Sequence, residues 1–149
     1  MQAMRNVALA ALFVVLAALG GAAWSAVSGI AANGVVFLSG GVGADEREEM
    51  ASRGGEFDLV VWAAERGSCG FVVPERLWVT DPRGVLVFEL APEGPITYLH
   101  LGPGRYVVRA TFNGVAESQA VVIPAVGRRN VYFYWPGAEA ASPSRSNAR

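Results

Sequence analysis

The sequence predicts an all-β protein, a single antiparallel β-sandwich of about seven strands with one short helix near its N-terminus. Short segments of alternating apolar and polar residues recur at intervals of about ten residues, and strong turn signals separate them. Only one short stretch has a helical pattern. Residues 26–135 are enough for one hydrophobic core, and we therefore expect one domain.

Residues 1–25 have the layout of a secretory signal peptide. Arg5 gives a positive start, residues 7–24 are apolar throughout, and Ala23-Trp24-Ser25 offers a small-x-small cleavage site before Ala26. We expect cleavage there, because the glycines and alanines at positions 20–23 weaken a helix where a peptidase needs extended chain.

Two alternatives to this cleavage site remain open. Later sites lie around Ser28 and Ala31, and the apolar run is just long enough to span a thinned bilayer as an uncleaved anchor. No cysteine follows the run, which argues against a lipid anchor. The expected location is periplasmic or secreted, with an inner-membrane anchor as the alternative.

Residues 26–56 are expected to form an N-terminal strand, a glycine-rich loop and the short helix. An apolar run within residues 33–39 suits an added strand, and Ser39-Gly40-Gly41-Val42-Gly43 then bends the chain. This loop lacks the Gly-Lys-Ser/Thr ending of a phosphate-binding loop, so we interpret it as a flexible bend.

The helix is expected from Asp45 to Ser52. Asp45 is the predicted N-cap, and Glu48 stands three residues later, as in a capping box. Glu46, Glu48 and Glu49 have the composition of a catalytic or metal cluster. Adjacent helical residues diverge, however, so we interpret them as a solvated helix face.

The sandwich proper is expected over residues 57–135. Its predicted strands follow from period-two alternation and cover residues 57–65, 76–81, 85–90, 96–101, 105–112, 115–123 and 129–135. The first of them is apolar on both faces, which is typical of a central strand. In the third, Leu86, Phe88 and Leu90 are expected to face the core. Residues 136–149 lack large apolar side chains and are predicted to be a disordered tail.

Local turn chemistry supports these boundaries. Asp81-Pro82-Arg83-Gly84 has the residues that a type I turn prefers, and Asn113-Gly114 suits a two-residue hairpin turn. Gly102-Pro103-Gly104 forms a tight entry to the strand that carries Tyr106. That tyrosine has the position of a tyrosine corner, whose ring packs in the core and whose hydroxyl bonds nearby backbone. These residues are assigned structural roles.

The segment Leu101–Val108, LGPGRYVV, with Gly114 after it, resembles the LPPGxYxVxAxxxG signature of carboxypeptidase regulatory-like domains. Thr80-Asp81-Pro82-Arg83-Gly84 resembles the T-D-x-x-G turn of the same family. The resemblance implies a transthyretin-like (prealbumin-type, Ig-like) sandwich in a small exported protein of a Gram-negative bacterium, with no catalytic residues. Gly102 departs from the family pattern, which has proline there, and Cys69 falls in a segment that is often glycine-rich.

The residues for chemistry are sparse. His100 is the sole histidine and Cys69 the sole cysteine, too few for a zinc site, and no Gly-x-Ser-x-Gly nucleophile motif occurs. Asp81 and Glu89 could be imagined as a carboxylate pair, but each has a simpler role in a turn or on a strand. The net charge of −1 gives no basic field for nucleic acid. We therefore expect no enzyme, metal or cofactor.

Aromatic side chains offer the best candidate binding surface. The strand phases turn Trp78, Tyr98, Tyr132 and Tyr134 away from the core, where flat rings can stack on sugars or anchor a protein. Trp62 shares this direction, but its strand is apolar on both sides, so we expect it to be covered.

These features predict a non-catalytic exported module that binds a protein or glycan partner in the periplasm or envelope. Contact with a membrane is expected only through the N-terminal segment, if it stays uncleaved. One alternative is a structural protein that pairs with other chains through its edge strands. A small hydrolase is the other, and it would need a pocket that gathers His100 with a carboxylate and a hydroxyl.

Overall fold

The computed structural model describes residues 26–68 and 70–137. The predicted signal peptide, Cys69 and residues 138–149 of the predicted tail lie outside the described residues. The described part forms nine strands, one α-helix and one short 3₁₀-helix, so the all-β prediction is confirmed. The strand count exceeds the predicted seven.

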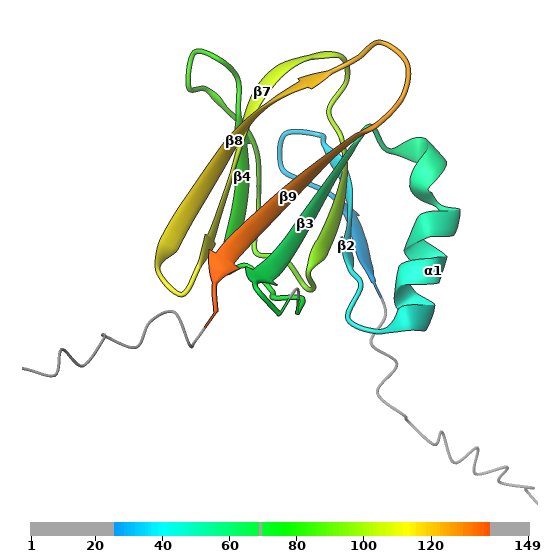
Figure 1. Ribbon diagram of the computed structural model, residues 1–149. Coiled ribbons are helices and arrows are strands. Elements are labelled where there is room, and N and C mark those ends of the chain that lie inside the picture. The colour runs from blue at the N-terminus through cyan, green and yellow to red at the C-terminus, as the bar shows by residue number, and fades with distance from the viewer. Residues whose placement is uncertain (1–25, 69, 138–149) are drawn as a thin grey trace, which may run out of the picture.

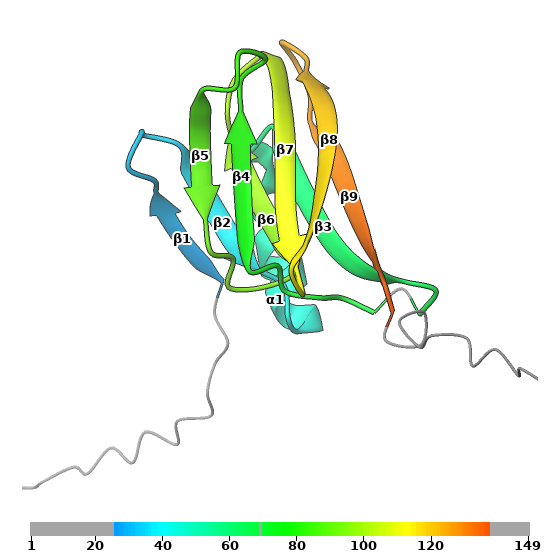
Figure 2. The ribbon, with the colours of Figure 1, turned by 90° about the vertical axis from the view of Figure 1, so that its left-hand side faces the viewer.

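Two sheets pack face to face (Figures 1 and 2). The five-stranded sheet has the order β1-β2-β6-β3-β9, with bounds Val27–Ile30, Val36–Gly40, Ile96–His100, Leu59–Arg66 and Arg129–Pro136. The four-stranded sheet has the order β5-β4-β7-β8, with bounds Leu86–Leu90, Arg76–Thr80, Gly104–Phe112 and Val115–Ile123. The strand predicted to be central, β3, lies between two neighbours.

The last strand, β9, pairs with β3 in parallel, from Leu59 opposite Arg129 to Arg66 opposite Pro136. Every other strand pair is antiparallel among the residues described. The expectation of a purely antiparallel sandwich is therefore wrong for this pair. After β8 the chain crosses from one sheet to the other, and it enters the second sheet in the direction of β3 (Figure 1).

The main core fills the space between the sheets. It gathers apolar side chains that alternate inward along both sheets, among them Phe37, Leu59, Val61, Leu77, Val79, Phe88, Val108, Val131, Phe133 and Trp135. The rings of Phe37 and Phe88 approach to 5.8 Å across the two sheets. Trp135 is almost fully buried, and its Nε1 donates to the Val115 carbonyl at 2.9 Å, which satisfies the one polar atom of the ring.

The predicted hairpin is present as β7 and β8. Asn113 and Gly114 have φ angles of 49° and 74°, the left-handed values that a two-residue turn of this kind requires. The strands pair from Gly104 opposite Ile123 to Phe112 opposite Val115, which fixes a register that alternation alone leaves ambiguous.

Two edge strands differ from expectation. β1 is not marked by any apolar pattern, because its residues are mostly exposed and it joins the sheet through backbone pairing with β2. In β5, Leu86 was expected to face the core. The register between β4 and β5 shifts at Val79 and Thr80, and this irregularity leaves Leu86 exposed while Phe88 stays buried.

The predicted helix, α1, spans Ala44–Ser52, and a 3₁₀-helix, η1, follows at Gly54–Glu56. The N-cap of α1 is Gly43, which has no side chain to cap the helix, so the assignment of Asp45 as N-cap is wrong. α1 begins at Ala44, one residue before the predicted start. Glu46 is buried rather than solvated. The helix lies on the outer face of the five-stranded sheet and closes a second core of Leu38, Met50, Phe57, Val60, Ile96 and Tyr98.

Candidate functional site

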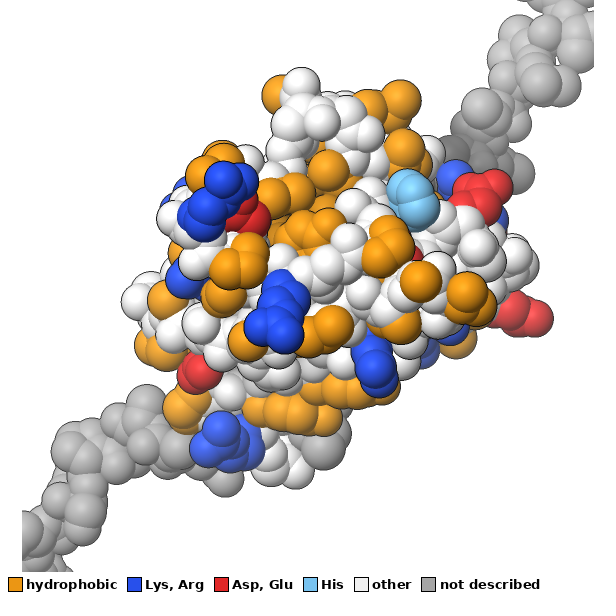
Figure 3. Space-filling view, turned by 90° about the horizontal axis from the view of Figure 1, so that it is seen from above, with side chains coloured by type: hydrophobic (Ala, Val, Ile, Leu, Met, Phe, Trp, Pro, Cys, Tyr) orange, Lys and Arg blue, Asp and Glu red, His pale blue; other side chains and the backbone are white. Residues whose placement is uncertain are grey.

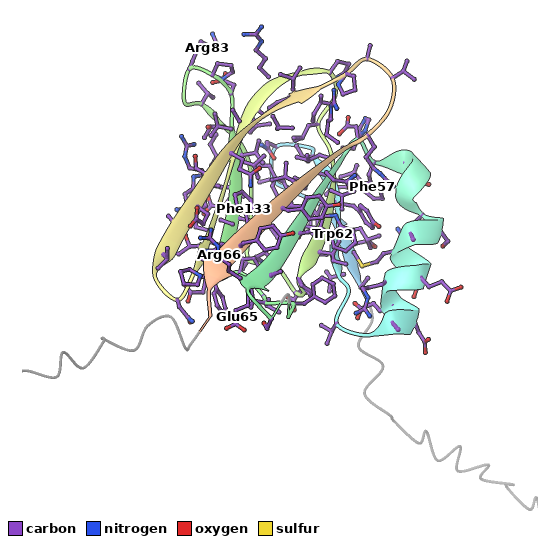
Figure 4. All side chains as sticks on the ribbon, viewed as in Figure 1. Phe57, Trp62, Glu65, Arg66, Arg83 and Phe133 are labelled. Atoms are coloured by element: carbon purple, nitrogen blue, oxygen red, sulfur yellow. The ribbon has the colours of Figure 1, made fainter. Side chains whose placement is uncertain are left out.

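The outer face of the five-stranded sheet is covered only in part. α1 lies over β2 and β6 and reaches the near side of β3, where Met50 packs with Val60 and Tyr98. Figure 4 shows Trp62 on β3 between the helix and β9. The helix therefore does not cover the outward residues of the second half of β3 and β9, where Tyr132 and Tyr134 are exposed.

Four aromatic rings surround Ala64 in this open region, and we call them with Ala64 the aromatic cup. Ala64 lies opposite Tyr134 on β9 and opposite Phe71 in an isolated antiparallel bridge. Two residues earlier on both strands, and therefore on the same face, Trp62 lies opposite Tyr132. Since paired residues share a face, all four rings rise around the small Ala64 side chain. The hollow has a volume of about 370 Å³.

Three of the rings form a continuous wall, and Tyr134 lines the hollow beside them. Trp62 stacks on Tyr132 with centroids 5.9 Å apart and planes 18° apart, and it meets Phe71 at 6.2 Å and 31°. The indole Nε1 of Trp62 donates to Oδ1 of Asn130 at 3.4 Å, which fixes the orientation of the ring. Phe71, Tyr132 and Tyr134 are 48%, 47% and 42% exposed, so the cup presents a large apolar surface to solvent.

Arg47 of α1 borders the cup. Its guanidinium lies 5.2 Å from the centroid of Phe71, and its Nη1 donates to the Gly41 carbonyl at 3.0 Å. One cation thus contacts both the ring and the loop that precedes the helix. Arg47 thus adds a positive charge beside a cup whose residues are apolar apart from the indole of Trp62 and the phenols of Tyr132 and Tyr134.

The structure distributes the predicted aromatic residues over three places. Tyr132 and Tyr134 lie in the cup. Trp78 lies on the outer face of the four-stranded sheet, with the Arg76 guanidinium 4.2 Å from its ring. Tyr98 is only 5% exposed and stacks on Phe57 at 5.6 Å, so its expected exposure is wrong, because α1 covers it.

Two cup residues were not predicted. Trp62, which was expected to be covered, stands at the centre of the ring wall and is only partly buried. Phe71 follows the glycine-rich connection after β3 and has no alternating pattern around it. The one available signal was its aromatic character beside Gly70 in a stretch that otherwise reads as a loop.

A second group of polar residues lies at the opposite end of the sandwich, around the turn before β7. Asp58 accepts hydrogen bonds from the amides of Leu101 and Gly102 at 2.9 and 2.7 Å. The Tyr106 hydroxyl donates to the carbonyls of the same two residues at 3.1 and 3.2 Å, as a tyrosine corner does. Burial, and then the charge of Asp58, raises the pKa of Tyr106.

His100 lies in a shallow cleft at this end, and Figure 3 shows it at the surface. Its Nδ1 is 3.4 Å from Oδ2 of Asp58, a residue that the sequence did not single out. The described residues that line the cleft include Glu56 and Pro103 but no serine, threonine or cysteine. Asp58 is already engaged in holding the turn.

The imagined carboxylate pair does not form. Glu89 binds Arg76 at 2.7 Å, whereas Asp81 accepts from the amides of Arg83 and Val85 in its own turn. The hydrogen bond from the Val85 amide is the main reason that the pKa of Asp81 is lowered. Gly84 completes the turn with a φ of 85°.

Residues 26–68 and 70–137 contain no group of three or more histidine, cysteine or acidic side chains placed to hold a metal ion. No helix in the same part of the chain is long and apolar enough to cross a membrane.

Comparison with known proteins finds no relative of this chain. No family model matches the chain, and no curated protein or solved structure matches it. The resemblance to carboxypeptidase regulatory-like domains therefore stays a prediction.

Proposed function

We propose that this protein is a non-catalytic, exported binding module that holds a glycan of the bacterial envelope in its aromatic cup. The observation that carries the proposal is the hollow around Ala64, which the rings of Trp62, Phe71, Tyr132 and Tyr134 line on a part of the sheet that α1 leaves uncovered. A pyranose ring has an apolar face of C–H groups that stacks on such rings, while its hydroxyls can bond to phenol oxygens at the rim.

Other features support a binding role over catalysis. The cleft at His100 brings a carboxylate but no hydroxyl nucleophile among its described residues, and Asp58 serves the turn. The signal-like N-terminal segment supports export. The resemblance to a domain family without catalytic residues, and the Tyr106 corner, support a transthyretin-like sandwich as the finer fold class.

Titration of the exported protein with soluble peptidoglycan fragments and envelope oligosaccharides tests the proposal, with tryptophan fluorescence and calorimetry as readouts. Tyr134→Ala and Trp62→Ala should each weaken binding about tenfold, because each removes one stacking surface. Trp78→Ala is the matched control, since this part-exposed ring lies on the other sheet. An equal loss in Trp78→Ala, or undiminished binding in both cup variants, would contradict the site. A protein captured through the cup, with no glycan bound, would favour a protein partner.

A second candidate is assembly through edge strands. β1 and β5 each pair on one side only, and between them lies a hollow lined by Ala31, Ala32, Asn33, Leu86 and Glu89. Ile30 and Leu86 are 72% and 49% exposed beside these edges, which is the kind of surface that invites strand pairing.

Light scattering after size exclusion tests the assembly role. Edge pairing predicts a dimer or larger species, and Leu86→Glu should convert it to a monomer because the edge then carries repelling charges. Val126→Glu is the control, an equally polar change at an exposed loop position. A strict monomer in the unmodified protein would rule this role out.

A further inference from the structure

Glu46 is the unusual acid of α1. The other helix acids, Asp45, Glu48 and Glu49, are exposed, whereas Glu46 is only 8% exposed. Its Oε2 accepts one hydrogen bond, from the Val42 amide at 3.3 Å. None of the ion pairs among the described residues includes it. A carboxylate removed from water without a cation is unfavourable, so the position calls for a positive partner.

The carboxylate borders the place where the folded chain begins. A Cβ on Gly40 would collide with Oε1 of Glu46, and it would lie 3.0 Å from both the Cα and the Cβ of Ala26. Glu46 and Ala26 therefore border the same small space, and the absence of a side chain on Gly40 gives the Glu46 carboxylate room there. Ala26 is partly buried and packs against the second core beneath α1.

The missing cation is available from the chain itself. The expected signal cleavage separates Ser25 from Ala26. In that reaction a leader peptidase breaks the peptide C–N bond, and water supplies a hydroxyl to the Ser25 carbonyl carbon and a proton to the nitrogen. The new amine is protonated at neutral pH, so Ala26 gains a positive charge that no interior peptide carries.

We propose that the chain is processed between Ser25 and Ala26 and that the new α-ammonium group pairs with Glu46. The pair joins the first residue of the mature protein to the first turn of α1. The negative charge of Glu46 also lies in the first turn of α1, where the helix dipole favours an acid. Glu46 thus interacts with both the ammonium group and the helix dipole. This inference is independent of the ligand of the aromatic cup.

The alternative processing sites fit the structure less well. Cleavage around Ser28 or Ala31 would remove residues of β1, whose backbone pairs with β2 from Val27 opposite Ser39 to Ile30 opposite Val36. The amide of Ala31 also donates to the Val35 carbonyl at 2.9 Å in the connection that follows. Either of these cuts, or a retained leader, would leave Glu46 without the ammonium group.

Two experiments test the proposal. In the first, the full chain is expressed in a Gram-negative host, and the exported protein is analysed by intact mass and N-terminal sequencing. The expected first residue is Ala26. Any other first residue, or an uncut chain, would overturn the processing site.

The second experiment compares protein that starts at Ala26 with protein that carries a Gly-Ser extension before it. The extension moves the charge away from Glu46 and should lower the melting temperature by about 2–5 °C. Glu46→Gln should abolish that difference, whereas Glu49→Gln, an exposed acid of the same helix, should preserve it. Equal melting temperatures with and without the extension, or an undiminished difference in Glu46→Gln, would overturn the ion pair.

Discussion

Leu101 and Gly102 are held from two directions at once. Their amides donate to Asp58, and their carbonyls share the single proton of the Tyr106 hydroxyl, so two side chains contact the four polar backbone groups of one bend. The sequence indicated the tyrosine from its place after a turn. It could not indicate Asp58, which is distant in sequence and meets the bend only because β3 lies beside β6.

Tyr106→Phe tests the corner. At neutral pH the variant should lose about 0.5–1.5 kcal/mol of unfolding free energy with the hydroxyl's hydrogen bonds. Since folding raises the pKa of Tyr106 above its ordinary value of 10.0, the unmodified protein keeps this stability below pH 10 and loses it as the pH rises through the folded-state pKa. Urea unfolding at a series of pH values should show the two proteins converging at alkaline pH.

Tyr134→Phe is the control for that titration, because its ring is exposed in the cup. It should leave both the neutral stability and the alkaline decline nearly unchanged. A Tyr106→Phe protein that declines as steeply as the unmodified one would show that another group causes the loss.

At the level of single elements, α1 decides which aromatic residues are available. The helix was predicted from its local pattern, and its boundaries were close, because acids and helix formers follow a glycine-rich bend. Its docking position was not predictable in the same way. Only the packing of Met50 against Leu38 and Tyr98 shows which half of the sheet it covers.

Met50→Ala should lower the unfolding free energy by about 2–5 kcal/mol, since Met50 is fully buried and the change opens a cavity beneath the helix. Chemical denaturation measures the loss. Glu48→Ala on the exposed face of α1 should change stability by no more than about 0.5 kcal/mol. Similar losses in the two variants would mean that α1 is not anchored through Met50.

For the whole molecule, local sequence patterns predicted the strands and turns, whereas they could not predict how these elements are arranged in space. Alternation places Trp78, Tyr98 and Tyr132 away from the main core, which is correct for all three. Alternation cannot say that these residues belong to different sheets, or that a helix covers one of them. Of the four rings of the cup, the sequence therefore predicted only Tyr132 and Tyr134 as binding residues. Trp62 and Phe71 lie beside them because of how β3 pairs with β9 and with Phe71, which the local pattern does not show.

The parallel pairing of β3 with β9 makes the cup a late product of folding. Trp62 and its partner Asn130 are 68 positions apart, and the two tyrosines arrive on the last strand of the fold. Contacts so distant in sequence form slowly, after the closure of a long loop. A chain that ends before β9 therefore carries only Trp62 and Phe71 of the four rings. Under the proposed function, ligand binding would distinguish complete molecules from incomplete ones.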